Sequence, residues 1–225
     1  MSLPEKEHIK NDLKRRILKL DLQPGERLDE TSLSNQYGIS RTPLRDIFRS
    51  LAGDGFIELK ENRGAIVTPM NHMVIHTFFL TAPMIYRAVS KLSARNRGSR
   101  FLDELKTSQR AFENAIKNYE LENIVLLNDH FHCIMGEMTE NPYIMAAQKR
   151  LLIDHARIGH TFWQPKDPEI YSRHEEAIGH HEELIIATEN GDEKRSVELS
   201  DLHWELTRDY LEDYMRPTPL DLEID

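Results

Sequence analysis

The chain has 225 residues, a formal net charge of −9 and a single cysteine, Cys133. This length fits one or two domains. No apolar run approaches the roughly 18 residues of a transmembrane helix, and the charged N-terminus lacks the apolar segment of a secretory signal. One cysteine excludes an intramolecular disulfide, so we expect a cytoplasmic protein in which Cys133 is a buried small hydrophobic residue.

The negative charge is unevenly distributed along the chain. Residues 1–70 contain 12 Lys and Arg against 11 Asp and Glu, whereas residues 71–225 contain 17 against 27. We therefore expect two domains with these boundaries. The acidic second domain can face away from a nucleic acid that the first one binds.

The first predicted helix spans about residues 5–20, where apolar residues recur at intervals of three and four. Turn residues follow at 22–26. Asp29 or Thr31 can cap the next helix, which ends at Gly38.

The helix after this turn has two distinct faces. Ser40 suits its N-cap, and Pro43 falls in the first turn, where its missing N–H costs nothing. Arg41, Arg45 and Arg49 lie four residues apart, away from the apolar face. Two short alternating segments, 56–60 and 65–67, then pair across a turn. The order of elements predicts a winged helix-turn-helix, whose second helix enters the DNA major groove.

The DNA-reading residues follow from this geometry. Arg45 can reach the O6 and N7 atoms of guanine in a bidentate contact. Phosphate contacts are expected from Ser40, Arg41, Thr42 and Arg49 near the helix N-terminus, and backbone or minor-groove contacts from Arg63 and Gly64 at the wing tip. Two alternatives are a plain solvated arginine face and a winged helix used only for protein contacts.

The rest of the chain is predicted to be all helical. Apolar residues keep helical spacing, and Gly, Asn and Pro residues mark the breaks. The expected fold class is mainly α, with a bundle of six or seven helices after the winged helix. The predicted helices span about residues 72–97, 100–118, 120–139, 142–163, 168–190 and 192–215.

Histidines gather in the second segment, where eight of the eleven lie between residues 130 and 203. Asn128 and His132 are one helical turn apart. A short turn at residues 190–191 would make the last two helices antiparallel and bring His181 level with His203. Imidazoles that converge inside a bundle with an oxygen ligand suit zinc or nickel. The alternative is that each histidine is an ordinary polar or core residue.

The first segment resembles the GntR family of bacterial transcription regulators. The resemblance rests on Pro24-Gly25-Glu26-Arg27-Leu28, Ser40-Arg41-Thr42-Pro43-Leu44-Arg45, Gly55-Phe56-Ile57 and Asn62-Arg63-Gly64-Ala65. It implies a homodimer that binds a short palindromic operator. It also implies that Arg41, Arg45 and Arg49 lie on the recognition helix and that Gly64 lies in the wing.

The second segment resembles the FCD ligand-binding domain of the FadR subfamily. The matching residues are Asn128-x-x-Phe131-His132, Asn141-Pro142, His181 with Ala187, and Gly191-Asp192 with His203. The resemblance implies a divalent metal ion held by Asn128, His132, His181 and His203. Asn128 stands where Asp is common, so the site has one negative charge fewer. Asp129 is a second choice, because it points about 100° away on the helix.

The resemblance also implies a small-molecule effector, commonly an organic acid that an arginine of the first bundle helix helps to hold. Ala82 occupies that position here, and Arg87 lies over one turn away. An organic-acid effector is therefore in doubt, although a metal ion can itself coordinate a carboxylate. The predicted effector pocket includes Arg87, His155, His160 and His174.

These features predict a ligand-responsive transcription regulator, not an enzyme, with no catalytic residue. One alternative is a protein that senses a metal without an organic effector, or whose metal is purely structural. The other is a metal-dependent enzyme fused to a DNA-binding domain. Its general base would be sought among Glu137, Glu175 and Glu182.

Overall fold

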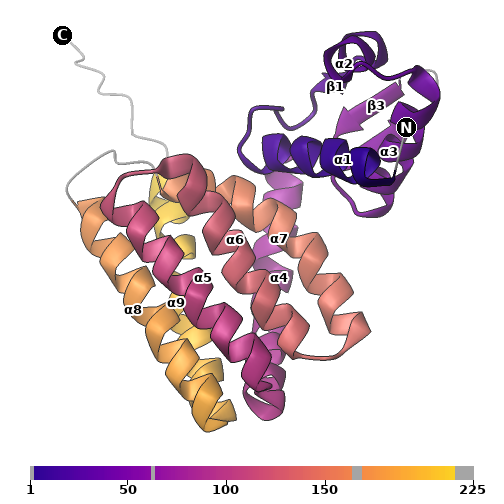
Figure 1. The fold of residues 1–225 in the computed structure, drawn as a ribbon. Helices are drawn as coiled ribbons and strands as arrows, with labels where there is room; N and C mark the ends of the chain where they lie inside the picture. Colours follow the sequence, from indigo (N-terminus) through magenta and orange to yellow (C-terminus); the bar gives the residue numbers. More distant parts are fainter. Residues whose placement is uncertain (1–2, 62–63, 164–168, 216–225) are drawn as a thin grey trace, which may run out of the picture.

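The computed structural model describes residues 3–61, 64–163 and 169–215. A winged helix at the N-terminal end is followed by a bundle of long helices (Figure 1). Among the described residues, no helix is both long and apolar enough to cross a membrane.

The winged helix combines three helices with three short strands. Buried leucines such as Leu13 of the first helix and Leu44 and Leu51 of the third fill its core, each with no exposed surface. In chain order the elements are α1 (Leu3–Leu18), β1 (Arg27–Leu28), α2 (Glu30–Tyr37), α3 (Arg41–Gly53), β2 (Ile57–Lys60) and β3 (Gly64–Val67).

The sheet has one strand more than the sequence predicted. Its order is β1-β3-β2 and both pairings are antiparallel, with Ala65 of β3 opposite Leu28 on one side and Leu59 on the other. The predicted hairpin is present as β2 and β3. The two residues of β1 are too few to show an alternating pattern, and pairing with β3 defines this strand.

Local capping residues mark the helix ends of the helix-turn-helix. The Asp29 carboxylate accepts a hydrogen bond of 2.6 Å from the backbone N–H of Ser32 and so caps α2. Gly38 ends α2 with a φ of 64°, a left-handed conformation that glycine adopts at little cost. Ser40 occupies the N-cap of α3 in an extended conformation, without a side-chain capping bond.

The bundle matches the predicted helices to within about two residues at each end. The bundle helices are α4 (His72–Asn96), α5 (Ser99–Lys117), α6 (Leu121–Met138), α7 (Pro142–Phe162), α8 (Glu169–Asn190) and α9 (Glu193–Met215). The central helix α4 packs against α6, α7, α8 and α9.

One cluster of buried apolar side chains crosses from the winged helix into the bundle. It includes Leu13 and Ile17 of α1, Ile124 and Val125 of α6, and Ile153 of α7. Helix α1 accordingly contacts both α6 and α7. The two parts of the chain therefore share a continuous core.

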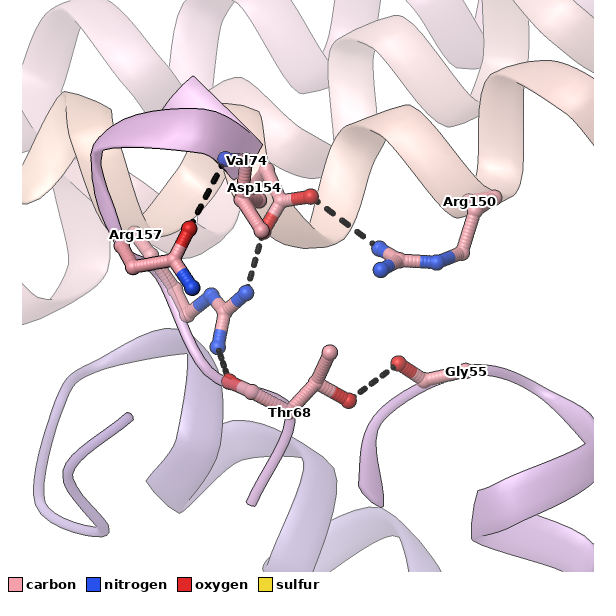
Figure 2. A network of polar contacts seen from close by, with 7 residues as sticks. Gly55, Thr68, Val74, Arg150, Asp154 and Arg157 are labelled. Atoms are coloured by element: carbon pink, nitrogen blue, oxygen red, sulfur yellow. Dashed lines mark hydrogen bonds and ion pairs between the residues drawn. The ribbon is translucent and has the colours of Figure 1, made fainter. Parts of the chain in front are cut away.

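A polar network adds to this contact (Figure 2). The Arg157 guanidinium of α7 is fully buried and donates a hydrogen bond of 2.6 Å to the carbonyl oxygen of Thr68, just after β3. Asp154 pairs with both Arg157 and Arg150. The Thr68 hydroxyl donates to the carbonyl oxygen of Gly55 at 2.8 Å. These contacts hold the segment that leaves the winged helix against α7.

Candidate DNA-reading surface and metal centre

The predicted DNA-reading residues of α3 share its solvent-facing side. The apolar residues of this helix, including Leu44, Ile47 and Phe48, are buried on the opposite side. The exposed set consists of Ser40, Arg41, Thr42, Arg45 and Arg49.

The wing is present as the hairpin strands β2 and β3. Gly64 is exposed and has a φ of 75°, in the left-handed region. Arg63, which the sequence also places at the wing tip, lies outside the described residues.

Each arginine of α3 has a partner that was not predicted from the sequence. Arg45 Nε donates to both oxygens of the Glu30 carboxylate of α2, at 3.0 and 3.1 Å, and Arg45 Nη2 forms an ion pair with Glu30 Oε2 at 3.0 Å. A bond of 3.0 Å runs from Arg41 Nη2 to Thr31 Oγ1, and one of 2.8 Å from Arg49 Nη1 to Asp46 Oδ1. No local spacing rule links Glu30 to a residue fifteen positions later, because only the crossing of α2 over α3 brings them together.

Three histidines converge inside the bundle. His132 of α6, His181 of α8 and His203 of α9 each offer a ring nitrogen, and these nitrogens lie within 4.8 Å of one another. All three side chains are buried. The Nε2 atoms of His181 and His203 are 3.3 Å apart. Two nitrogen ligands of a tetrahedral zinc ion, each at about 2.0–2.1 Å from it, are separated by about 3.3 Å.

Buried polar atoms around this cluster also fit a cation. Among the described residues, the Asn128 Oδ1 and His132 Nε2 atoms are buried and have no hydrogen-bond partner. Asn128 lies one turn before His132 on α6 and is itself buried. Unpaired buried acceptors are costly unless something else binds them. The donor set, an amide oxygen with three imidazoles, is one that zinc and nickel accept.

The protonation states favour metal binding. Burial, together with the neighbouring imidazoles, holds the pKa of His132 and His181 well below the usual range for histidine. Burial likewise lowers the pKa of His203 to about 3. At neutral pH all three rings are therefore uncharged, which is the form that coordinates metals.

Two glutamines position the histidines. The amide oxygen of Gln109 on α5 lies 3.1 Å from His181 Nδ1. Because an amide oxygen only accepts, Nδ1 carries the hydrogen, and the lone pair of Nε2 is available to a metal ion. Gln148 of α7 donates a bond of 2.8 Å to the carbonyl oxygen of His132. A Cβ atom at Gly136 would collide with the Gln148 amide, so only glycine permits this approach. Neither glutamine was predicted from the sequence, since nothing in a lone glutamine signals such a role.

A small cavity adjoins the cluster. It has a volume of about 20 Å³ and is lined by His132 and His203 together with Tyr86, His155 and Trp204. The Tyr86 hydroxyl and His155 Nδ1 are 2.9 Å apart. A space of this size holds roughly one water molecule. The cavity in this conformation is therefore too small for an organic metabolite.

Of the predicted effector-pocket residues, only His155 lines this cavity. The Arg87 side chain is mostly exposed and pairs with Asp201 of α9 at 2.6 Å. His174 is buried beside Phe162, whose carbonyl oxygen lies 3.2 Å from its Nε2. His160 is half-buried on the other side of α7, and Ala82 is a fully buried core residue. These differences arise because spacing along the sequence does not determine which face of each helix turns toward the cavity.

Asp129 and Cys133 face away from the histidines. Both line a second cavity, of about 770 Å³, between the winged helix and the bundle. Burial raises the pKa of the Asp129 carboxyl to about 7 and also raises the pKa of the Cys133 thiol. This placement favours Asn128 over Asp129 as the oxygen ligand. Cys133 is only partly buried, in contrast to the prediction.

The carboxylates considered as general bases lie elsewhere. None of the three lines the cavity beside the histidines. All are on exposed helix faces, namely Glu137, Glu175 and Glu182.

Two family models match the chain. Residues 5–67 match the bacterial regulatory proteins of the gntR family, and residues 84–206 match the FCD domain.

Two curated relatives are similar in sequence. An uncharacterized HTH-type transcriptional regulator, YdhC of Bacillus subtilis, is 27% identical over 138 residues, which is 60% of each chain. The HTH-type transcriptional repressor RspR of Escherichia coli is 25% identical over 137 residues, or 61% of this chain and 60% of its own. The match thus spans about 60% of the length of these relatives.

Two solved structures share the fold. E. coli McbR/YncC aligns over 96% of this chain and 100% of its own, with a TM-score of 0.79 and 18% identity. A GntR-type regulator from Rhodococcus sp. RHA1 aligns over 94% and 99%, with a TM-score of 0.72 and 15% identity. At these identities the likeness establishes the architecture alone.

Proposed function

Because this chain belongs to the GntR family of bacterial transcription regulators that carry an FCD domain, we propose that it binds a palindromic operator as a homodimer and responds to a small molecule through a metal ion. The winged helix, residues 1–70, would be the DNA-binding domain. The bundle, residues 71–225, would bind the effector and dimerise. The family and the relatives are regulators and not enzymes.

The operator-reading role is supported by the exposed arginine face of α3. We assign base reading to Arg45 and backbone contacts to Ser40, Arg41, Thr42 and Arg49, with Arg63 and Gly64 at the wing. Selection of DNA from a random library by the full-length protein gives the operator sequence. An Arg45→Ala variant that still prefers the selected DNA over random DNA would refute the assignment of the recognition helix.

Metal binding is the part of the proposal that the geometry supports best. The observation that carries it is the meeting of three buried, uncharged imidazoles, with nitrogens within 4.8 Å, from three different helices. Asn128, His132, His181 and His203 would hold zinc or nickel. Bound there, the ion would supply a positive charge and open coordination positions for an anionic ligand.

The effector is proposed to be a small metabolite, with an organic acid as the first class to test. Tyr86 and His155 beside the ligand set can donate hydrogen bonds to it. Because the cavity is only about 20 Å³, such a ligand requires the surrounding helices to move apart. Effector binding would then shift the population of conformations in which the two DNA-binding domains match the operator.

A second candidate is a sensor of the metal itself. The size of the cavity favours it, since the space admits a single ion or water molecule, but no metabolite, without rearrangement. A thermal-shift screen of metabolites, run with and without zinc or nickel, separates the two candidates. A further shift from one class of acid only in the presence of metal supports the metabolite. Stabilisation by metal alone, with a matching change in operator affinity, supports the metal sensor.

Dimerisation is supported by a row of exposed apolar side chains on α4. Met73, Leu80 and Met84 are 67%, 70% and 63% exposed, at spacings of seven and four along one face. Such a face on a helix is typical of an interface. A second copy of the chain would cover it and bring two recognition helices into register with the half-sites of a palindrome.

A further inference from the structure

Arg45 of α3, to which we assign base reading, forms an ion pair with the carboxylate of Glu30 of α2. Arg45 Nε lies 3.0 and 3.1 Å from the two oxygens of Glu30, and Arg45 Nη2 lies 3.0 Å from Glu30 Oε2. Glu30 is the first residue of α2, so this pair bridges the two helices of the helix-turn-helix.

The pairing with Glu30 leaves the outer end of the Arg45 guanidinium available to DNA. Glu30 takes the edge formed by Nε and Nη2, whereas the hydrogens of Nη1 and the second hydrogen of Nη2 point away from it. Reading guanine requires two parallel donors toward O6 and N7, which that end provides. Arg45 remains accessible, since its side chain is 57% exposed while that of Glu30 is 23% exposed.

We propose that Glu30 is a positioning residue that fixes the Arg45 guanidinium for reading one guanine of each half-site. The inference rests on the proposed role of Arg45 in operator recognition. A free arginine side chain loses much rotational freedom when it forms a bidentate contact. Glu30 restricts that freedom before DNA arrives, so less of it is lost on binding the correct base.

The neighbouring arginine is held differently and provides a comparison. Arg49 contacts one oxygen of Asp46, at 2.8 Å, and this acid belongs to the same helix. Lys6 contacts the other oxygen of Asp46 at 3.3 Å. One contact does not define the plane of a guanidinium, which suits a phosphate contact rather than the reading of a base.

The charge of Glu30 has an opposite effect on affinity. A carboxylate next to the DNA surface repels phosphates and weakens binding to every sequence. Glu30 therefore sharpens the choice of sequence at a cost in overall affinity. Its removal should strengthen binding to random DNA while weakening discrimination.

The test uses the full-length protein and the operator that it selects from a random DNA library. Dissociation constants are measured for this operator, for each single-base variant of it and for random DNA. We expect Glu30→Gln to bind random DNA more tightly and to lower the operator-to-random ratio about 5-fold or more. The loss should fall on the base pairs at which Arg45→Ala also loses discrimination. Glu30→Asp, which keeps a carboxylate, should restore part of the ratio.

Asp46→Asn is the matched control, because it removes the same charge from the same helix-turn-helix. It should change the affinity for all DNAs alike and leave the ratio within about 2-fold. Two results would overturn the role of Glu30 while leaving operator recognition by Arg45 intact. One is an operator-to-random ratio in Glu30→Gln equal to that of the wild-type protein. The other is a loss spread evenly over all positions, as in the control. If the wild-type protein selects no consensus, or Arg45→Ala retains it, the proposed operator recognition fails and the inference with it.

Discussion

The buried guanidinium of Arg157 donates a hydrogen bond of 2.6 Å to the backbone carbonyl of Thr68. Arg157 belongs to α7 of the bundle, and Thr68 directly follows the last strand of the winged helix. The only carboxylate paired with Arg157 in the described residues is Asp154. A buried charge is tolerated only with such partners, so the position of Thr68 is part of what stabilises Arg157.

We expect Arg157→Met to lower the free energy of unfolding by about 3 kcal/mol or more, because it leaves the Thr68 carbonyl and Asp154 short of a buried partner. Urea denaturation measures the change. Arg150→Met removes a partner of the same carboxylate, but Arg150 is 44% exposed and its pair with Asp154 should contribute less than about 1 kcal/mol. Equal losses in both variants would contradict the structural role of Arg157.

The long helices and the meeting of His132, His181 and His203 were largely predictable from the sequence. Periodic apolar residues define the bundle helices, and the spacings of Asn128 from His132 and of His181 from His203 place the pairs together in any antiparallel arrangement. Gln109 was not predictable, because it lies 72 residues from His181 and reaches it only through the packing of α5 on α8. The pair of Glu30 with Arg45 depends in the same way on how two helices cross.

Metal binding should depend on the histidine cluster and, to a lesser degree, on its support. His132→Ala is expected to abolish zinc uptake while leaving basal DNA binding measurable. Gln109→Leu should weaken zinc binding about 10- to 100-fold, since it no longer fixes the ring of His181. Competition with a chromophoric chelator measures both effects. His174→Ala, a buried histidine outside the cluster, is the control, and a similar loss in this variant would point to unfolding instead.

The buried histidines should make the metal-free protein sensitive to acid. Burial lowers the pKa of His155 to about 4, whereas an unfolded histidine titrates near 6.5. The unfolded state therefore binds more protons between these values, and stability falls as the pH falls from about 6.5 toward 4. For His155 alone the loss between pH 7.5 and pH 5 is about 2 kcal/mol.

Urea denaturation of chelator-treated protein at several pH values checks this. His155→Gln should show a shallower decrease in stability with falling pH than the wild-type protein does. An unchanged slope would mean that His155 is protonated in the folded state, contrary to its burial.

Charges on the exposed face of α4 should break the proposed dimer. Leu80→Glu with Met84→Glu places two carboxylates where a second copy would pack, so we expect a monomer by light scattering and much weaker operator binding. Ile186→Glu is the control, since Ile186 is 57% exposed but lies on α8. A double variant that stays dimeric would move the interface to another face.

Helix α6 contacts both the winged helix and the histidine cluster. Ile124 and Val125 pack in the core shared with the winged helix, and His132 belongs to the histidine cluster. Val125 and His132 are about 10 Å apart along the helix. A helix transmits displacement along its length with little loss. If the histidines bind a metal ion as proposed, the radius of that ion would therefore set the position of the whole of α6. Ions of different size would then present the paired recognition helices at different separations.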